Sequence, residues 1–275
     1  MNVVLDACSA HHVQANQLRR AALHNVSLTV GSGEQVAVIG SSGSGKTTLL
    51  NAISCAVRPT SGTVHLGNID PWKLRTAELQ RLRGKLFLAP QVPPLPPRQR
   101  VVTSVLAGRL PGMSLTQSLL NLLMPSDIGL AENALARFDL SEKLFERVDR
   151  LSGGERQRVG LARLVASTAD LLLVDEPLSA LDPTRAQQAI KSLSDVCLER
   201  RGTLIVTLHH VEMALENFTR IVGMRDGEIA FDLPATEVTK DRLRDLYASR
   251  QDELYLAGRQ DVLVERSPPV AVVCR

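Results

Sequence analysis

A glycine-rich segment at residues 40–47 constrains the fold of this 275-residue chain more than any other feature. The apolar residues 36–39 predict a buried strand before it, and residues 46–53 predict a helix after it. Its spacing, G-x-x-x-x-G-K-T, is that of a phosphate-binding loop. The segment consists of Gly40, Ser41, Ser42, Gly43, Ser44, Gly45, Lys46 and Thr47, with Thr48 next in the helix. We therefore predict a phosphate cradle, named the phosphate loop below, rather than a glycine turn with a chance lysine.

The residue types in the phosphate loop explain how it would hold a nucleotide. Glycines let the backbone N–H groups curl around the phosphates, and the helix N-terminus adds a partial positive charge. Lys46 can reach the β- and γ-phosphates, while the Thr47 hydroxyl can coordinate Mg²⁺. The loop thus predicts a nucleotide bound together with magnesium.

Charge and cysteine content argue against several other classes of protein. Lys and Arg total 32 against 29 Asp and Glu, so the strongly basic footprint of a nucleic-acid binder is missing. Cys8, Cys55, Cys197 and Cys274 are scattered, which favours reduced thiols over a disulfide framework or a zinc site. No run of about 18 apolar residues occurs, so we expect no transmembrane helix and a cytoplasmic location.

The regions on either side of the phosphate loop predict two smaller lobes. Short apolar runs at 3–5, 26–30 and 63–66 indicate antiparallel strands of a small β-lobe. Basic residues alternate with leucines over 73–85, which indicates a solvated helix face more than a specific anion site. After the proline-rich hinge 92–97, residues 101–150 have a helical pattern, so we expect a helical lobe inserted between strands.

A second set of polar residues follows the helical lobe. Ser152, Gly153 and Gly154 form a Ser-Gly-Gly turn at the start of a helix, a second potential anion site. The apolar run 171–174 predicts a buried strand that leaves Asp175 and Glu176 at the carboxyl edge of a parallel sheet, where α/β proteins bind ligands. Another apolar strand, 204–208, ends at His209-His210, and residues 221–224 and 228–231 indicate a hairpin.

Together these motifs resemble the ATPase subunits of ABC transporters over roughly residues 1–250. The motifs that carry the resemblance are the phosphate loop, Gln91 after a strand, the Ser-Gly-Gly turn in Leu-Ser-Gly-Gly-Glu-Arg-Gln-Arg, the Asp175-Glu176 pair, Ser179 to Asp182, and His209. The resemblance implies an α/β fold of the P-loop NTPase type. Its mostly parallel core sheet would carry an antiparallel β-lobe and an inserted helical lobe at about 92–165. The tail 251–275 stays unassigned.

The family resemblance also implies a division of roles in ATP hydrolysis. Asp175 would hold Mg²⁺ through water, and Glu176 would be the general base that polarises the attacking water. Lys46 and His209 would neutralise charge on the γ-phosphate, with Gln91 touching the metal or the water. Ser152, Gly153 and Gly154 would bind the γ-phosphate held by a second copy in a head-to-tail dimer. Asp182 would belong to the loop that links the two copies.

Two histidines need separate arguments. The family spacing His-x-x-x-x-Ala, counted back from Ala214, selects His209 rather than His210 for the γ-phosphate. Family members present an aromatic ring, often Tyr, about where His12 lies, and here the neighbourhood has no aromatic residue. Imidazole can stack on adenine over a smaller area, so His12 is the candidate.

Several stretches look like the ATPase subunit of phosphonate importers, namely 103–110, 118–120 and 207–214. Residues 91–98 depart from that subfamily, so phosphite and phosphate esters stay open as cargo. The expected partners are separate transmembrane permease subunits and, indirectly, a periplasmic or extracellular substrate-binding protein, with the chain peripheral on the cytoplasmic face of the membrane. The alternative is a soluble ATPase subunit of a non-transport complex such as a carbon–phosphorus lyase. A phosphate-loop kinase would not explain the Ser-Gly-Gly turn or His209.

Overall fold

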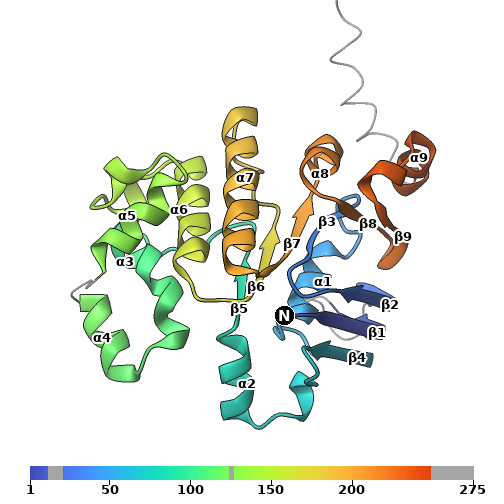
Figure 1. Cartoon of the computed structure of the whole chain (residues 1–275), viewed down its shortest axis with the longest axis horizontal. Coiled ribbons are helices and arrows are strands. Elements are labelled where there is room, and N and C mark those ends of the chain that lie inside the picture. The colour runs from blue at the N-terminus through green and yellow to red at the C-terminus, as the bar shows by residue number, and fades with distance from the viewer. Residues whose placement is uncertain (12–20, 124–126, 249–275) are drawn as a thin grey trace, which may run out of the picture.

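The computed structural model describes residues 1–11, 21–123 and 127–248. Figure 1 shows a central sheet with helices beside it, a small β-lobe at one side and a helical lobe at the other. His12 and the tail 251–275 lie outside the described residues. Within them, no helix is both long enough and apolar enough to cross a membrane.

The central sheet is mostly parallel, as the sequence predicts. Its strand order is β5-β6-β7-β3-β8-β9, and only β9 pairs in the antiparallel sense. The strands are β3 (Gln35–Ile39), β5 (Leu86–Ala89), β6 (Leu171–Asp175), β7 (Thr203–Leu208), β8 (Arg220–Arg225) and β9 (Glu228–Pro234). The helices that follow these strands or lie beside the sheet are α1 (Lys46–Ile53), α7 (Pro183–Arg200), α8 (Val211–Asn217) and α9 (Lys240–Tyr247).

The two faces of this sheet pack into two separate apolar clusters. Side chains alternate along a strand, so Val36 and Val38 of β3 join one cluster while Ala37 and Ile39 join the other. One cluster contains α1 and the β-lobe, and the other contains α7 and the helical lobe. Burial on both faces explains why the parallel strands read as unbroken apolar runs in the sequence.

The β-lobe is a three-stranded antiparallel sheet of order β2-β1-β4. Its strands are β1 (Val3–Ala10), β2 (Leu23–Val30) and β4 (Ser61–Leu66). The prediction of antiparallel strands here is confirmed, although β1 extends beyond the apolar run 3–5. Ser9 lies within β1, and its carbonyl accepts hydrogen bonds from the Thr60 N–H (2.8 Å) and hydroxyl (3.0 Å), so backbone pairing continues past the apolar residues.

The helical lobe lies between β5 and β6 in the chain, as predicted. It contains α3 (Val101–Leu106), α4 (Leu115–Leu123), α5 (Ile128–Ala136) and α6 (Gly153–Ala166), with short 3₁₀ turns η2 (Ala107–Gly112), η3 (Ser141–Lys143) and η4 (Val148–Arg150). Its interior is built on Phe138, Leu135 and Leu140, each at most 1% exposed. The proline-rich residues 92–97 form a loop without regular structure between β5 and this lobe.

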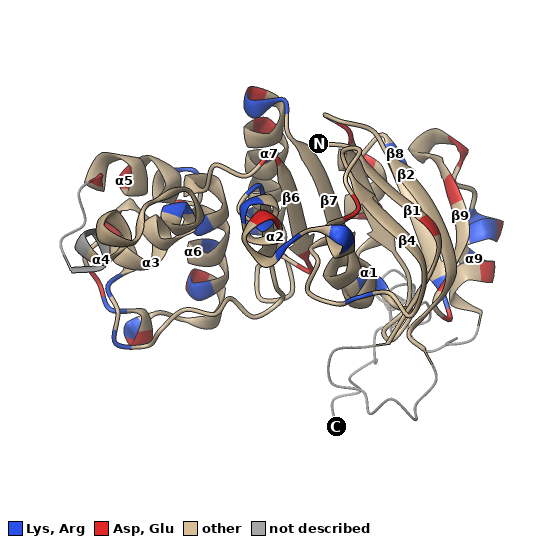
Figure 2. Ribbon diagram, turned by 90° about the horizontal axis from the view of Figure 1, so that it is seen from below, with Lys and Arg blue, Asp and Glu red and all other residues tan. Residues whose placement is uncertain are grey.

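The basic stretch 73–85 folds differently from one continuous helix. Pro71–Lys73 is a 3₁₀ turn (η1), and the helix α2 covers only Thr76–Arg83. Glu78 caps the first turn of α2 by accepting from the Arg75 N–H at 3.0 Å. Figure 2 shows acidic as well as basic segments on α2, which agrees with a solvated helix face.

Candidate nucleotide site

The phosphate loop lies between β3 and α1 and has no room for larger residues. Gly40, Gly43 and Gly45 have φ angles of +153°, +81° and +103°, which L side chains rarely adopt. A Cβ atom on Gly40 would lie 2.2 Å from the Met224 carbonyl oxygen of β8. The Gly227 N–H of the β8–β9 turn donates to the Ser44 carbonyl at 3.0 Å. The loop is therefore held against the central sheet by its backbone.

The donors inside this loop suit an anion. Lys46 is 4% exposed, and its Nζ donates to the carbonyls of Gly40 (2.8 Å) and Ser41 (3.1 Å). The first turn of α1 carries no acidic residue, so the partial positive charge of the helix N-terminus is not neutralised locally. Ser44 Oγ is buried and finds no hydrogen-bond partner among the described residues. A phosphate group would give such a hydroxyl its missing partner.

A carboxylate and two threonine hydroxyls meet beside the phosphate loop. Thr47 Oγ1 donates to Asp175 Oδ2 at 2.9 Å, and Thr207 Oγ1 donates to Asp175 Oδ1 at 2.6 Å. Asp175 and Thr207 are register partners on β6 and β7, so the parallel pairing brings them together. Both oxygens of the carboxylate are thus oriented, and one of them faces the start of α1.

Glu176 follows β6 in a strained backbone conformation. Its φ of +47° lies in the left-handed region, which costs a non-glycine residue on the order of 1–3 kcal/mol. The Glu176 N–H donates to the Thr207 hydroxyl (3.0 Å) and carbonyl (3.2 Å), which holds the residue in place. Strain at a carboxylate beside a phosphate-binding loop is a feature of functional sites.

The side chain of Glu176 points at a histidine and a lysine. His209 Nε2 lies 2.5 Å from Glu176 Oε1, and Lys46 Nζ lies 3.9 Å from the same oxygen. The hydrogen bond from His209, with the charges of His209 and Lys46, lowers the pKa of Glu176 below its ordinary value against the opposing effect of burial. The carboxylate is therefore ionised near neutral pH and able to accept a proton.

One cleft collects most of the predicted residues. Its lining includes part of the phosphate loop and the predicted residues Glu176, His209 and Gln91, together with Ala22 and Ser179. Gln91 reaches it from the loop after β5, although it is distant from the phosphate loop in the sequence. The structure thus brings Lys46, Thr47, Gln91, Glu176 and His209 together at the carboxyl edge of the central sheet, with Asp175 beside Thr47.

The Ser-Gly-Gly turn does not join this cleft. Ser152 is the N-cap of α6, where its Oγ accepts from the Glu155 N–H (3.2 Å) and its own N–H donates to Glu155 Oε2 (2.7 Å). Gly153 has no atom within 4 Å of the place where a Cβ would lie, so it faces open space. The turn is thus a capped helix N-terminus that is open at Gly153 and does not line the cleft with the phosphate loop.

Thr207, which binds both Asp175 and Glu176, was not among the site residues predicted from the sequence. It is the polar residue near the end of the apolar run 204–208, and the pairing of that run with β6 would have placed it next to Asp175. Asp182 has a structural role within the chain, because it is the N-cap of α7 and accepts from the Arg185 N–H at 3.1 Å. His210 is exposed at the start of α8.

Comparison with known proteins identifies the family. The family model described as ABC transporter matches residues 23–179. A Polaromonas protein named "Phosphonates import ATP-binding protein PhnC" is 62% identical over the full length of both chains. A protein of Albidiferax ferrireducens named "Phosphonates import ATP-binding protein PhnC 2" is 59% identical, again over the full length of both.

Solved structures agree in fold. The ATP-binding cassette MJ0796, described as a dimeric post-hydrolysis state bound to ADP and Pi, superposes with a TM-score of 0.71 at 29% identity, covering 85% of this chain and 98% of that one. A second dimeric structure of MJ0796, titled a bacterial ABC transporter cassette, gives a TM-score of 0.72 at 28% identity with the same coverage. From its motifs, its fold and its relatives, the chain belongs to the ABC transporter family.

Proposed function

We propose that this chain is the ATP-hydrolysing subunit of a phosphonate importer. The observation that carries the ATPase assignment is the ionised Glu176 carboxylate, hydrogen-bonded to His209 and next to Lys46 of the phosphate loop. The phosphonate assignment is supported by the names of full-length relatives at 62% and 59% identity.

The residues beside the phosphate loop fit a magnesium ion. Mg²⁺ prefers oxygen ligands and is usually bound through one or two carboxylates plus substrate phosphates, rather than by a complete protein cage. The Thr47 hydroxyl and the Asp175 carboxylate, 2.9 Å apart, form such a partial set, and Gln91 lines the same cleft. When bound, the ion neutralises charge on the β- and γ-phosphates. No cluster of three or more acidic, histidine or cysteine side chains suited to a metal occurs in the described part of the chain.

The side chains at the cleft can each be given a role in ATP hydrolysis. The phosphate loop binds and aligns the phosphates, and Lys46 would exchange its present contacts with loop carbonyls for phosphate oxygens. Glu176 would accept a proton from the attacking water, because its lowered pKa keeps it ionised. His209 would orient that carboxylate and donate toward the γ-phosphate, while Gln91 helps to orient the water or the ion. His12, outside the described residues, stays the candidate for stacking on adenine.

The site would be completed by a second copy of the chain. The Ser-Gly-Gly turn is an exposed helix N-terminus that does not line the cleft with its own phosphate loop, and such a terminus binds anions well. In a head-to-tail dimer Ser152, Gly153 and Gly154 would meet the γ-phosphate held by the other copy. The similar cassette MJ0796 is described as dimeric, which supports this arrangement.

The remaining partners follow from the import function. Separate transmembrane permease subunits would carry the cargo across the membrane, with this chain peripheral on the cytoplasmic face. A substrate-binding protein outside the membrane would deliver the phosphonate. The ABC ATPase domain would span residues 1–250, with the helical lobe at about 92–165 and the tail 251–275 unassigned. The alternative, a soluble carbon–phosphorus lyase subunit, is disfavoured because the full-length relatives are named import proteins.

Two variants test the ATPase assignment. Glu176→Gln should keep ATP binding and lose hydrolysis by about 10²–10⁴-fold, the usual contribution of a general base. Lys46→Ala should instead weaken ATP binding itself, as measured by equilibrium dialysis. Wild-type turnover in Glu176→Gln would refute the base, and unchanged ATP affinity in Lys46→Ala would refute the phosphate site.

A transport measurement tests the import assignment. Cells that lack this gene should fail to take up radiolabelled methylphosphonate within the first minute, and the wild-type gene should restore uptake. The Glu176→Gln gene should not. Normal initial uptake together with blocked phosphonate breakdown would instead favour the soluble lyase complex.

A further inference from the structure

We propose that Gln157 of α6 is a positioning residue that holds Glu176 in its hydrolytic conformation and ties that conformation to the Ser-Gly-Gly turn. The inference rests on the proposed role of Glu176 as the base. It concerns a side chain that does not line the cleft with the phosphate loop, so Gln157 would act through Glu176 rather than on the nucleotide itself.

The backbone of Glu176 is held from two sides. Gln157 Nε2 donates to the Glu176 carbonyl oxygen at 3.1 Å, and Gln157 is only 5% exposed. On the other side, the Glu176 N–H donates to Thr207 of β7 at 3.0 Å. A glutamate at a φ of +47° is strained, so it keeps that conformation only while its surroundings enforce it. Without the bond from Gln157, the residue could relax toward an ordinary φ and turn its carboxylate away from His209.

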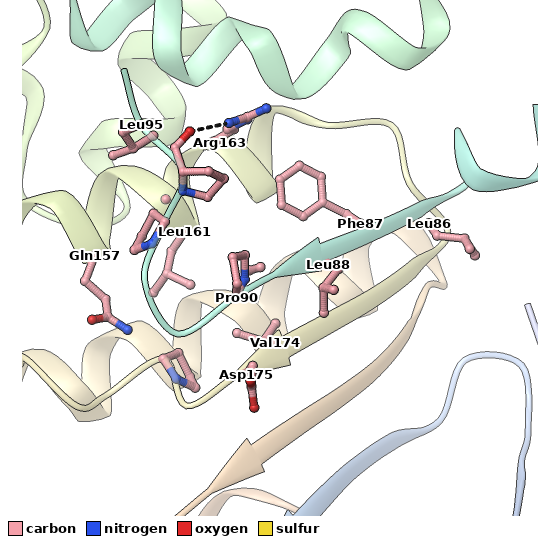
Figure 3. Close-up of a pocket in the computed structure, with 15 residues that line it drawn as sticks. Leu86, Phe87, Leu88, Pro90, Leu95, Gln157, Leu161, Arg163, Val174 and Asp175 are labelled. Atoms are coloured by element: carbon pink, nitrogen blue, oxygen red, sulfur yellow. Dashed lines mark hydrogen bonds between the residues drawn. The ribbon is translucent and has the colours of Figure 1, made fainter. Parts of the chain in front are cut away.

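The same helix contacts the loop that carries Gln91. A Cβ on Gly160 would lie 2.6 Å from Pro93 Cγ, so α6 and this loop approach as closely as a glycine allows. Arg163 Nη1 donates to the Pro94 carbonyl at 3.4 Å, one helical turn further on. Figure 3 shows Gln157, Leu161 and Arg163 along α6, around a pocket shared with the end of β5 and with Asp175. One face of α6 therefore contacts two of the chain segments that bring polar groups to the cleft, the one with Glu176 and the one that follows Gln91.

The start of α6 is the Ser-Gly-Gly turn, about one helical turn before Gln157. A helix transmits displacement as a rigid body over so short a distance, because its backbone hydrogen bonds fix the spacing of successive turns. When the turn binds the γ-phosphate held by a second copy, the position of α6 becomes fixed. The hydrogen bond from Gln157 then fixes the position of the Glu176 backbone. The base would then be aligned in the same step that completes the site.

The first test removes the hydrogen bond and keeps the shape. Gln157→Met has nearly the same length and volume but no N–H to donate. We expect kcat for ATP to fall about tenfold, equivalent to about 1.4 kcal/mol, while KM stays within about twofold. Hydrogen exchange should show faster exchange of the Glu176 amide. Gln187→Met is the matched control, because that exposed glutamine on α7 also donates a side-chain bond, to Asn217 at 2.9 Å, and should keep wild-type kcat.

A double variant separates positioning from a general structural role. If Gln157 acts through Glu176, adding Gln157→Met to Glu176→Gln should leave the residual rate unchanged. An equal loss on both backgrounds, or an unchanged kcat in Gln157→Met alone, would overturn the inference. If Gln157→Met does not fold, Gln157→Glu replaces the donor at constant shape and should lower kcat likewise. Wild-type turnover in Glu176→Gln would show instead that Glu176 is not the base. The proposed role of Gln157 would then be refuted as well, because it depends on that assignment.

Discussion

The phosphate loop and the Ser-Gly-Gly turn both place glycines at the start of a helix, yet they are built in opposite ways. Glycines of the phosphate loop have left-handed φ angles and lie against backbone, with 2.2 Å from a Gly40 Cβ to the Met224 oxygen. Gly153 has ordinary φ and open space around it, while its neighbour Gly154 lies against the backbone, with 2.7 Å from a Gly154 Cβ to the Ala180 carbonyl oxygen. The phosphate loop is enclosed by other parts of its own chain. The Ser-Gly-Gly turn is capped by its own residues and stays exposed at Gly153.

This difference indicates where each turn finds its ligand. The phosphate loop is tightly enclosed and has a buried Ser44 hydroxyl without a partner among the described residues, so we propose that it binds an anion within its own chain. For the exposed, capped N-terminus of α6 we propose a ligand presented by a second copy. Variants that change one turn at a time separate effects on folding and nucleotide binding from effects on assembly.

The largest effect is expected from Gly40→Ala. The new methyl group would lie 2.2 Å from the Met224 carbonyl, so β8 or the loop must move. We expect a loss of about 3 kcal/mol or more in the free energy of unfolding, together with loss of ATP binding. Chemical denaturation and equilibrium dialysis measure the two effects. Wild-type stability in this variant would show that the loop is not as enclosed as the structure indicates.

Gly153→Asp should leave folding intact and damage hydrolysis. The site has room for the side chain, and an acidic residue in the first turn of α6 favours the isolated helix. The same charge would repel the γ-phosphate of a second copy, so we expect hydrolysis to fall about a hundredfold with unchanged ATP affinity. Steady-state phosphate release at saturating ATP measures the change. If Gly153→Asp lowered the free energy of unfolding as much as Gly40→Ala, the two turns would not differ in how tightly they are enclosed.

Ser152→Ala tests the capping role of the Ser-Gly-Gly turn. Loss of the Oγ that accepts from the Glu155 N–H should cost about 1 kcal/mol of stability. The control is Thr239→Ala, which removes the cap of α9, where Thr239 Oγ1 accepts from the Arg242 N–H at 3.3 Å. Both variants should lose similar stability in thermal unfolding, but only Ser152→Ala should also lower hydrolysis. Equal rates of ATP hydrolysis in the two variants would show that Ser152 only caps α6 and has no role in hydrolysis.

The smallest effect is a pH dependence at the same turn. The hydrogen bond from the Ser152 N–H lowers the pKa of Glu155 below its ordinary value of 4.5. A carboxyl group whose pKa is lower in the folded than in the unfolded protein stabilises the fold at pH values above the unfolded pKa. This stabilisation is lost as the pH falls through the folded pKa. The Tm difference between wild type and Glu155→Ala should therefore be steady above about pH 5 and shrink below pH 4.5. A Tm difference between the two proteins that stays constant down to pH 3.5 would contradict the lowered pKa of Glu155.

Much of the fold was predictable because its signals are local. The phosphate loop spacing fixed a strand, a turn and a helix, and α1 begins and ends where the sequence predicts. Apolar runs located the buried parallel strands for the same reason. The helices α7 and α9 were missed, although Asp182 before Pro183 and Thr239 before Lys240 are recognisable helix starts.

The candidate site was less predictable where it depends on tertiary contacts. Motif residues such as Lys46, Glu176 and His209 could be named from the sequence, and the structure brings them within 4 Å of one another in pairs. The left-handed φ of Glu176 and its bond to Gln157 have no sequence signature, because they arise from tertiary packing, and its bond to Thr207 could be predicted only once the register of β6 and β7 was known. The roles of these residues in hydrolysis stay predictions until the variants are measured.

The most direct test of the central claim is the mass of the Glu176→Gln protein in solution, measured by light scattering with and without saturating MgATP. We expect one chain without ATP and two chains with ATP, because blocked hydrolysis should trap the closed pair. Adding Gly153→Asp should return the mass to one chain while dialysis still detects bound ATP. A mass of one chain with ATP bound in the Glu176→Gln protein would contradict a site shared between two copies.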